Sequence, residues 1–176
     1  MKKNLILGVI DNYGFDQLKK FVYSIRRTEF KGDIVFFTGP SISPLTVRLL
    51  KKYDIRLVYF PGVTQLPPDN IAEKRFKLPQ PVNYFNYRHY LYYDYLQRNA
   101  GVYDKILLAD IRDVYFQADP FSFEMNDALY CAIEGPRMIK DCSYNGRWMK
   151  FIYGDAVLEQ LGGNRISCAG STWGKE

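Results

Sequence analysis

The chain has 176 residues, of which 47% are hydrophobic and 24% are charged, with a formal net charge of +5 and an isoelectric point near 9.0. This length suits one packed domain, and this balance of apolar and charged residues indicates a globular rather than a disordered chain. The positive charge suits an anionic ligand or surface, although the basic residues are scattered along the sequence rather than gathered in one tract. We therefore expect a single domain over residues 1–176.

Cysteine usage and hydropathy indicate where such a chain would work. The cysteines are odd in number and lack the paired spacings of a zinc site or a disulfide framework; they are Cys131, Cys142 and Cys168. The apolar run at residues 5–10 stops at Asp11, too early for a signal peptide, and no stretch approaches the roughly 20 apolar residues of a membrane span. We expect a cytoplasmic protein with no transmembrane segment, for which peripheral contact with a membrane stays open.

The first sixty residues alternate between strand and helix patterns. Short apolar runs predict strands and apolar residues at helical spacing predict helices, in the order 5–10 strand, 15–28 helix, 33–38 strand, 43–53 helix and 55–60 strand. Ser43 followed by Pro44 matches a helix N-cap with proline at the first helical position. This alternation is typical of a parallel sheet with right-handed crossovers.

The pattern resumes after a proline-bearing segment without clear periodicity, residues 61–81. A tyrosine-rich helix is expected over 83–97, and for its His89 we favour a helix position without catalytic duty. Further along, we expect strands over 105–109 and 130–133, helices over 144–153 and 155–161, and a short strand from Arg165 that runs into a small-residue loop.

Two carboxylates, Asp110 and Asp113, follow the apolar run 105–109 where that strand must leave the sheet. In open α/β sheets, ligands gather outside the carboxyl ends of the strands. Acidic side chains this close repel each other unless a positive group lies between them, and a divalent cation would take carboxylate oxygens and share its other positions with phosphates. A solvated turn with Arg112 as counter-ion is the open alternative.

The strand ends carry a series of motifs that agree in order and approximate spacing with a known family. The motifs are Asp11-Asn12-Tyr13, Tyr87-Arg88, Asp110 to Asp113, Glu134 at the end of the next strand, and Cys168-Ala169-Gly170. Over nearly the whole chain they resemble nucleotide-sugar-dependent glycosyltransferases of the GT-A fold, most closely the group similar to glycosyltransferase family 8. The resemblance implies a Rossmann-like α/β fold with a mostly parallel central sheet flanked by helices, lacking its usual C-terminal part.

The resemblance also implies how a UDP-sugar donor would be bound. Asp11, Asn12 and their backbone would bind the uracil edge, and Tyr13 would stack on the base. Arg88 would neutralise phosphate or hold the donor sugar. From the residues alone, Tyr13 is equally well a packing aromatic, and Arg88 a surface charge lying across tyrosine rings.

By the same resemblance, Asp110 and Asp113 would hold Mn²⁺ or Mg²⁺ against the leaving diphosphate. Glu134, as the catalytic residue, would lie beside the sugar hydroxyls, together with the backbone of Ala169 and Gly170. The spacing DxxD departs from the family's DxD, and Cys168 stands where the family has asparagine. From the residues alone, Glu134 is equally well a solvated strand end.

We therefore expect a metal-dependent glycosyltransferase that moves a sugar from a UDP-sugar to a saccharide or other acceptor. The alternative is a non-catalytic or truncated nucleotide-sugar-binding domain, which would bind the donor without turnover. A nucleic-acid-binding module ranks last, because the basic residues spread over several elements and no recognition motif occurs.

Overall fold

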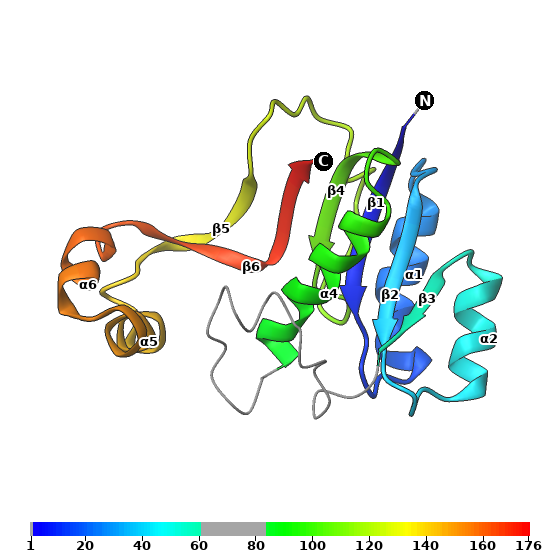
Figure 1. Cartoon of the computed structure of the whole chain (residues 1–176), viewed down its shortest axis with the longest axis horizontal. Coiled ribbons are helices and arrows are strands. Elements are labelled where there is room, and N and C mark those ends of the chain that lie inside the picture. Colours follow the sequence, from blue (N-terminus) through cyan, green and yellow to red (C-terminus); the bar gives the residue numbers. More distant parts are fainter. Residues whose placement is uncertain (1, 61–83) are drawn as a thin grey trace.

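A computed structural model describes residues 2–60 and 84–176, so the irregular segment predicted at 61–81 lies outside the described residues. Six strands form one sheet in the order β3-β2-β1-β4-β6-β5 (Figure 1). The strands are β1 (Lys3–Val9), β2 (Asp33–Thr38), β3 (Arg56–Tyr59), β4 (Tyr103–Ala109), β5 (Tyr130–Met138) and β6 (Arg165–Lys175). The helices are α1 (Phe15–Arg27), α2 (Pro44–Lys52), α4 (Tyr84–Arg98), α5 (Ser143–Tyr153) and α6 (Asp155–Leu161).

The first four strands of the sheet are parallel, since β1 pairs in parallel with both β2 and β4, and β2 pairs in parallel with β3. The register places Leu7 of β1 opposite Val35 of β2 on one side and Leu108 of β4 on the other. β6 is antiparallel to both β4 and β5. The prediction of a mostly parallel α/β sheet flanked by helices is confirmed.

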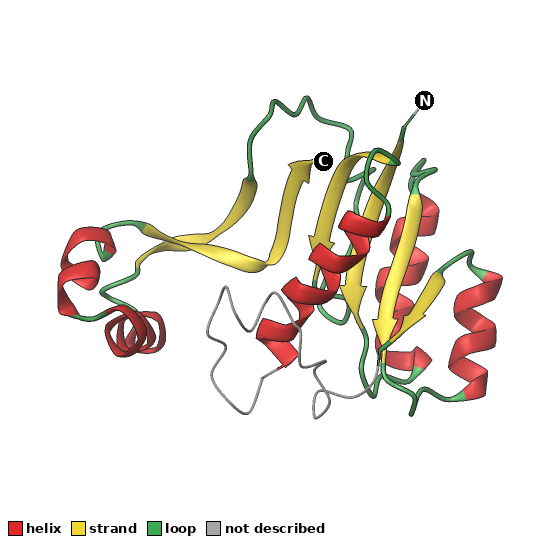
Figure 2. Ribbon diagram, viewed as in Figure 1, coloured by secondary structure: helices red, strands yellow, loops and turns green. Residues whose placement is uncertain are grey.

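Alternating residues of β1 are buried on opposite faces of the sheet. Leu5 and Leu7 belong to a core cluster shared with α4, whereas Ile6 belongs to a second cluster shared with α1. Helices thus cover both faces of the parallel strands (Figure 2), which is why these strands are continuously apolar rather than alternating. Each fully buried aliphatic or aromatic side chain contributes roughly 1.5–3 kcal/mol to this packing.

Local sequence signals place the helix starts. Ser43 is the N-cap of α2, its Oγ accepts a hydrogen bond from the Thr46 backbone N–H at 3.1 Å, and Pro44 is the first helical residue, as predicted. At the start of α1, the Gly14 N–H donates to Oε1 of Gln17 at 3.0 Å. Both helices therefore begin where β1 and β2 deliver the chain at one edge of the sheet.

The last two strands differ from the sequence prediction. β5 continues to Met138 and most of it is exposed, so the prediction of a buried strand that ends at Glu134 is wrong. β6 is one long strand, so the predicted loop at Ala169 and Gly170 is also wrong. The reason in both cases is long-range pairing of backbone, which composition alone does not reveal. β5 is extended by pairing with β6, and β6 continues through Gly170 because its second half pairs with β4.

Between β5 and β6 the chain forms a projecting arm, which we define as residues 139–164 and which contains α5 and α6. Figures 1 and 2 show the two helices away from the sheet, beyond the far end of the β5–β6 ribbon. Gly146 is the one buried residue in these two helices. None of the helices described is both long and apolar enough to span a bilayer.

Candidate functional site

The predicted site residues that follow β1 and β4 lie at one edge of the sheet, where the parallel strands end. β1 and β4 are neighbours, and Leu7 pairs with Leu108, so the two strands end at nearly the same level. Asp11 follows β1 and Asp110 follows β4 directly. This edge is where ligands of open parallel sheets bind.

Asp11 and Asn12 form a small polar cluster with the loop that follows β2. The Asp11 carboxylate accepts a hydrogen bond from Nδ2 of Asn12 at 2.9 Å, and Oδ1 of Asn12 accepts one from Oγ of Ser41 at 2.8 Å. Asn12 has φ 58°, in the left-handed region that asparagine tolerates better than most residues. The loops after β1 and β2 are thus tied together beside the Asp11 carboxylate.

Gly39 gives this carboxylate its room. A Cβ at position 39 would lie 2.6 Å from Oδ1 of Asp11, far inside van der Waals contact. A glycine at a strand end can indicate close approach of the backbone to a neighbouring group. Gly39 and Ser41 are site neighbours that the motif comparison missed.

Tyr13 is half-buried and packs against the core cluster on the α1 side of the sheet. Arg112 is charged and lies near this ring: its pKa is raised first by its hydrogen bonds to Asp113, and to a smaller extent by Tyr13. Tyr13 therefore has a packing role in the structure, with part of its ring open to solvent at the same edge as Asp11.

Arg88 of α4 binds the residue that follows β4. Nη1 donates to Oδ1 of Asp110 in a short ion pair, and Nη2 donates to the carbonyl oxygen of Ala169 at 3.2 Å. The Arg88 side chain is 13% exposed, and its Nε–H is buried without a hydrogen-bond partner among the described residues. A buried donor left unpaired is costly, so an acceptor atom from a ligand would relieve it.

Gly170 completes this arrangement, because its carbonyl oxygen accepts a hydrogen bond from the Asp110 N–H at 2.8 Å. A Cβ at position 170 would lie 2.8 Å from Oδ2 of Asp110. Four of the predicted residues are therefore in contact. We call them the Arg88 cluster: Arg88, Asp110, Ala169 and Gly170.

Asp113 is not part of that cluster. Its carboxylate accepts hydrogen bonds from Nε and Nη2 of Arg112 at 3.1 and 3.2 Å. These bonds lower the pKa of Asp113, with a smaller contribution from Lys20 on α1, whereas Asp110 contacts α4 on the other face of the sheet. Each of the two predicted metal ligands therefore forms an ion pair with a different arginine.

The donor set can be tested against a divalent cation. Among the described residues, no group of three His, Cys, Asp or Glu side chains could hold a metal ion. The Asp110 side chain is 48% exposed, and the bare Gly170 backbone leaves space at Oδ2. Because Mg²⁺ and similar ions often take one or two carboxylates and complete their shell with water and phosphate, Asp110 fits such a role as a single protein ligand.

His89 lies close enough to Asp110 for the two charges to interact. Its pKa is lowered, first by burial and then by the charge of Arg88, while Asp110 opposes the shift. Its ring meets that of Tyr92 edge-on, with centroids 6.1 Å apart. A helix position without catalytic duty stays a prediction for His89.

Glu134 lies on β5, the strand next to β6, which carries Ala169 and Gly170. It is exposed in the middle of β5, and β6 lies between β5 and β4. Ile133 beside it pairs with Ser167, three residues before Gly170. Sequence spacing alone missed this, because it took the end of an apolar run for the end of the strand.

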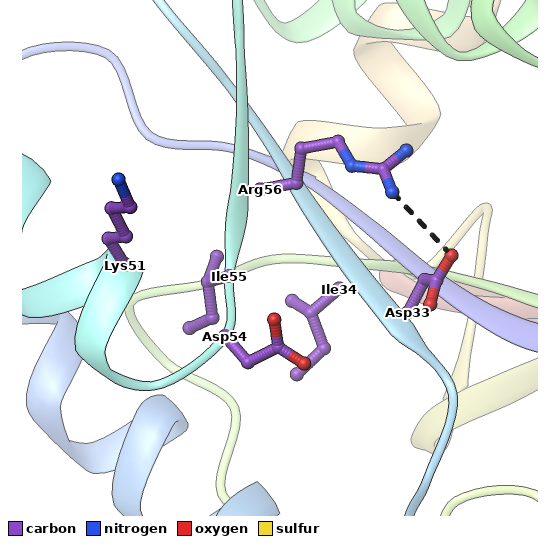
Figure 3. Close-up of a pocket in the computed structure, with 6 residues that line it drawn as sticks. All are labelled: Asp33, Ile34, Lys51, Asp54, Ile55 and Arg56. Carbon is purple, nitrogen blue, oxygen red and sulfur yellow. Dashed lines mark ion pairs between the residues drawn. The ribbon is translucent and has the colours of Figure 1, made fainter.

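A pocket of about 210 Å³ lies at the opposite edge of the sheet, where β2 and β3 begin. Figure 3 shows Arg56 reaching toward Asp33, and their ion pair spans 4.0 Å. Asp33 also accepts hydrogen bonds from Nζ of Lys3 at 3.1 Å and from the Tyr103 hydroxyl at 3.3 Å. This pocket lies away from the strand ends that carry the motifs.

Comparisons with known proteins bear on the fold. No protein-family model and no curated protein match the chain. Core-mannan synthase A from Aspergillus fumigatus, in its Mn/GDP form, is similar in structure with a TM-score of 0.51 and 12% identity, over 99% of this chain and 60% of that one. The glycosyltransferase GlyE from Streptococcus pneumoniae TIGR4 has a TM-score of 0.44 and 15% identity, over 98% of this chain and 34% of that one.

The likeness to core-mannan synthase A establishes the fold class. The chain has the α/β architecture of a GT-A-type glycosyltransferase, as the motifs predicted, and it spans about three-fifths of that enzyme's length. At 12% identity the likeness concerns the fold alone. Membership of family 8, the donor and the metal remain predictions from the motifs.

Proposed function

We propose that this domain binds a nucleoside diphosphate sugar at the carboxyl ends of β1 and β4, between Asp11 and the Arg88 cluster. We further propose that it serves in glycosyl transfer to a carbohydrate acceptor. The observation that carries the proposal is the Arg88 cluster at the carboxyl ends of parallel strands. It has a mostly buried guanidinium, with one N–H that has no partner among residues 2–60 and 84–176, beside a half-exposed carboxylate. Such a site suits an anionic ligand with phosphate oxygens.

In this proposal, Asp11 and Asn12 contact the base of the donor, and the Arg88 cluster contacts its diphosphate and sugar. Asp11 and Asn12 would accept and donate hydrogen bonds to the edge of the base, and the open part of the Tyr13 ring would stack on it. Base stacking on an aromatic ring is worth roughly 1–3 kcal/mol. The motifs favour uridine, whereas the structure of core-mannan synthase A was determined with GDP, so both nucleotides belong in the test.

Arg88 would neutralise the diphosphate through Nε, while Nη1 and Nη2 keep their bonds to Asp110 and Ala169. Asp110 would hold Mn²⁺ or Mg²⁺, with Asp113 as a second ligand once it leaves Arg112. A divalent ion bound there supplies Lewis-acid stabilisation of the leaving diphosphate. The backbone of Ala169 and Gly170 would contact the sugar. We retain Glu134, on the neighbouring strand β5, as the proposed catalytic residue.

Calorimetry with UDP and with GDP, each with and without Mn²⁺, tests the metal assignment. We expect Asp110→Asn to weaken metal-dependent binding by about tenfold or more, equivalent to roughly 1.4 kcal/mol, because one ligand oxygen is lost. Asp113→Asn is expected to have a smaller effect, since Asp113 must first leave Arg112.

Asp16→Asn is the matched control, because Asp16 is an exposed residue of α1 whose carboxylate contacts Lys19 at 2.9 Å. Metal-stimulated affinity that is unchanged in Asp110→Asn would rule out the metal assignment. If neither UDP nor GDP binds the unmodified chain with Mn²⁺ present, the nucleotide site itself is wrong.

The second candidate, binding without turnover, is favoured by the exposed position of Glu134 in β5, outside the contacts that form the Arg88 cluster. A donor-hydrolysis assay beside the calorimetry separates the two. Hydrolysis of a nucleotide sugar that is lost in Asp110→Asn supports an enzyme, whereas tight binding with no hydrolysis supports a binding domain.

A further inference from the structure

Helix α5 of the projecting arm has large apolar side chains on its surface. Phe151 is 88% exposed and Tyr144 is 74% exposed, and Trp148, Ile152 and Tyr153 are each about half exposed. Apolar exposure of this extent on one short helix exceeds the scattered single residues found on ordinary surfaces. This exposed apolar surface therefore suits a partner that buries aromatic and aliphatic side chains together.

Four of these residues form one stripe along the helix. Tyr144, Trp148, Phe151 and Ile152 stand at i, i+4, i+7 and i+8, the spacing of a single helical face. The exposed Leu161 at the end of α6 adds to the apolar surface of the arm. The stripe therefore belongs to the arm and is separate from the site at the sheet edge.

Basic residues accompany the stripe. α5 contains Arg147 and Lys150 and no acidic residue, and Arg137 and Lys140 precede it, all four exposed. The excess of positive charge is confined to residues 137–153, where Asp141 is the one carboxylate; the rest of the arm, residues 154–164, adds Asp155 and Glu159. Lys150 also contacts Asp155 at 2.7 Å in an exposed ion pair, which solvent screens.

We propose that α5 is a membrane-interface helix, whose aromatic stripe enters the headgroup region of a bilayer that contains anionic phospholipids. Tryptophan and tyrosine prefer that region because their rings are apolar and their N–H and O–H groups remain hydrated. Lysine and arginine on the same helix reach the lipid phosphates, and anionic lipids attract such segments. This inference goes beyond the proposed transferase function and does not depend on it.

Charge favours a bilayer over a second copy of the chain. A two-fold contact between α5 helices would bring Arg147 and Lys150 of one copy close to the same residues of the other. Like charges placed together oppose association, whereas the same cations are complementary to lipid phosphate. The position of α5 beyond the far end of the β5–β6 ribbon also lets it reach a flat surface without burying the sheet edge that carries the motifs (Figure 1).

Vesicle flotation tests this proposal on the full 176-residue chain. We expect the protein to float with vesicles of phosphatidylcholine and phosphatidylglycerol in equal parts, and only weakly with phosphatidylcholine alone. Phe151→Glu is expected to weaken binding to the anionic vesicles by about tenfold or more, because a charge replaces an inserted aromatic ring. Trp148 should shift its fluorescence emission to the blue when vesicles are added, and Trp148→Phe should remove that shift.

Leu45→Glu is the matched control, since Leu45 is 57% exposed on α2 and the substitution makes the same change in charge and polarity away from the arm. Equal losses in the two variants, or no binding to anionic vesicles, would overturn the proposal. So would a concentration-dependent dimer, seen by sedimentation equilibrium, that Phe151→Glu abolishes. Circular dichroism of each variant shows that the fold is retained.

Discussion

The carboxylates of the site are controlled by the residues in contact with them. Asp11 has Gly39 beside it and Asp110 has Gly170, and in both places a Cβ would press on a carboxylate oxygen. Asp110 accepts a hydrogen bond from Arg88, whereas Asp113 accepts two from Arg112. Two similar acidic residues three positions apart thus have different partners and different faces.

Gly39→Ala tests the role of Asp11. The added methyl group must displace the Asp11 side chain, whose end is flexible, so the fold should lose less than about 1 kcal/mol. Binding of UDP or GDP should weaken by about tenfold, because the carboxylate no longer points where it does now. Calorimetry measures the affinity and urea unfolding measures the stability.

Gly14→Ala serves as the control, since a Cβ there would meet nothing within 4 Å and its φ of −78° is one that alanine adopts. If Gly39→Ala binds the nucleotide as well as the unmodified chain does, the Asp11 carboxylate is not in contact with the base.

At the scale of elements, one buried serine joins α1 to the segment that follows the acidic turn. Ser24 is 1% exposed; its Oγ donates to the carbonyl oxygen of Phe21 and accepts from the Phe116 N–H, both at 3.0 Å. Phe116 packs edge-on against Phe21 with ring centroids 4.9 Å apart. The segment after Asp113 is thereby held against the α1 face of the sheet.

Ser24→Ala leaves the Phe116 N–H buried without its partner. We expect the free energy of unfolding to fall by about 1–3 kcal/mol, the usual cost of an unsatisfied buried donor. Urea unfolding followed by circular dichroism measures the change. Ser143→Ala, at an exposed position in the first turn of α5, should change stability by less than about 0.5 kcal/mol, and a similar change in both variants would contradict the role of Ser24.

For the whole molecule, the structure separates a packed sheet from the projecting arm. Met138 of β5 pairs with Arg165 of β6, so the two strands face each other where the arm begins. The arm contributes little to the core, because Gly146 is the one buried residue in its helices. Stability and membrane contact are therefore expected to reside in different parts of the chain.

Replacing residues 139–164 by Asn-Gly should yield a two-residue hairpin between Met138 and Arg165, since this pair favours the tight turn that antiparallel strands need. We expect the melting temperature to change by less than roughly 4 °C, corresponding to about 1 kcal/mol, and nucleotide binding to persist. Vesicle binding should be lost. Unfolding of the shortened chain, seen by calorimetry, would show that the arm supports the sheet.

The sequence alone determined the α/β class and the first half of the topology, because short apolar runs, helix periodicity and the Ser43-Pro44 cap are local signals. It also singled out Asp11 and Asp110, which follow β1 and β4, and Arg88, which contacts Asp110; their roles in binding stay predictions. The contacts between these residues could be identified only from the tertiary structure.

Only the tertiary structure decided three features. It placed Asp110 with Arg88 and Asp113 with Arg112. Which partner a side chain at the end of a strand meets depends on the helix that packs on that face of the sheet. Glu134 lies in the middle of an exposed strand, because β5 is extended by pairing with β6. The helices of the arm are away from the core, since a periodic apolar pattern indicates a helix but does not say what covers its apolar face.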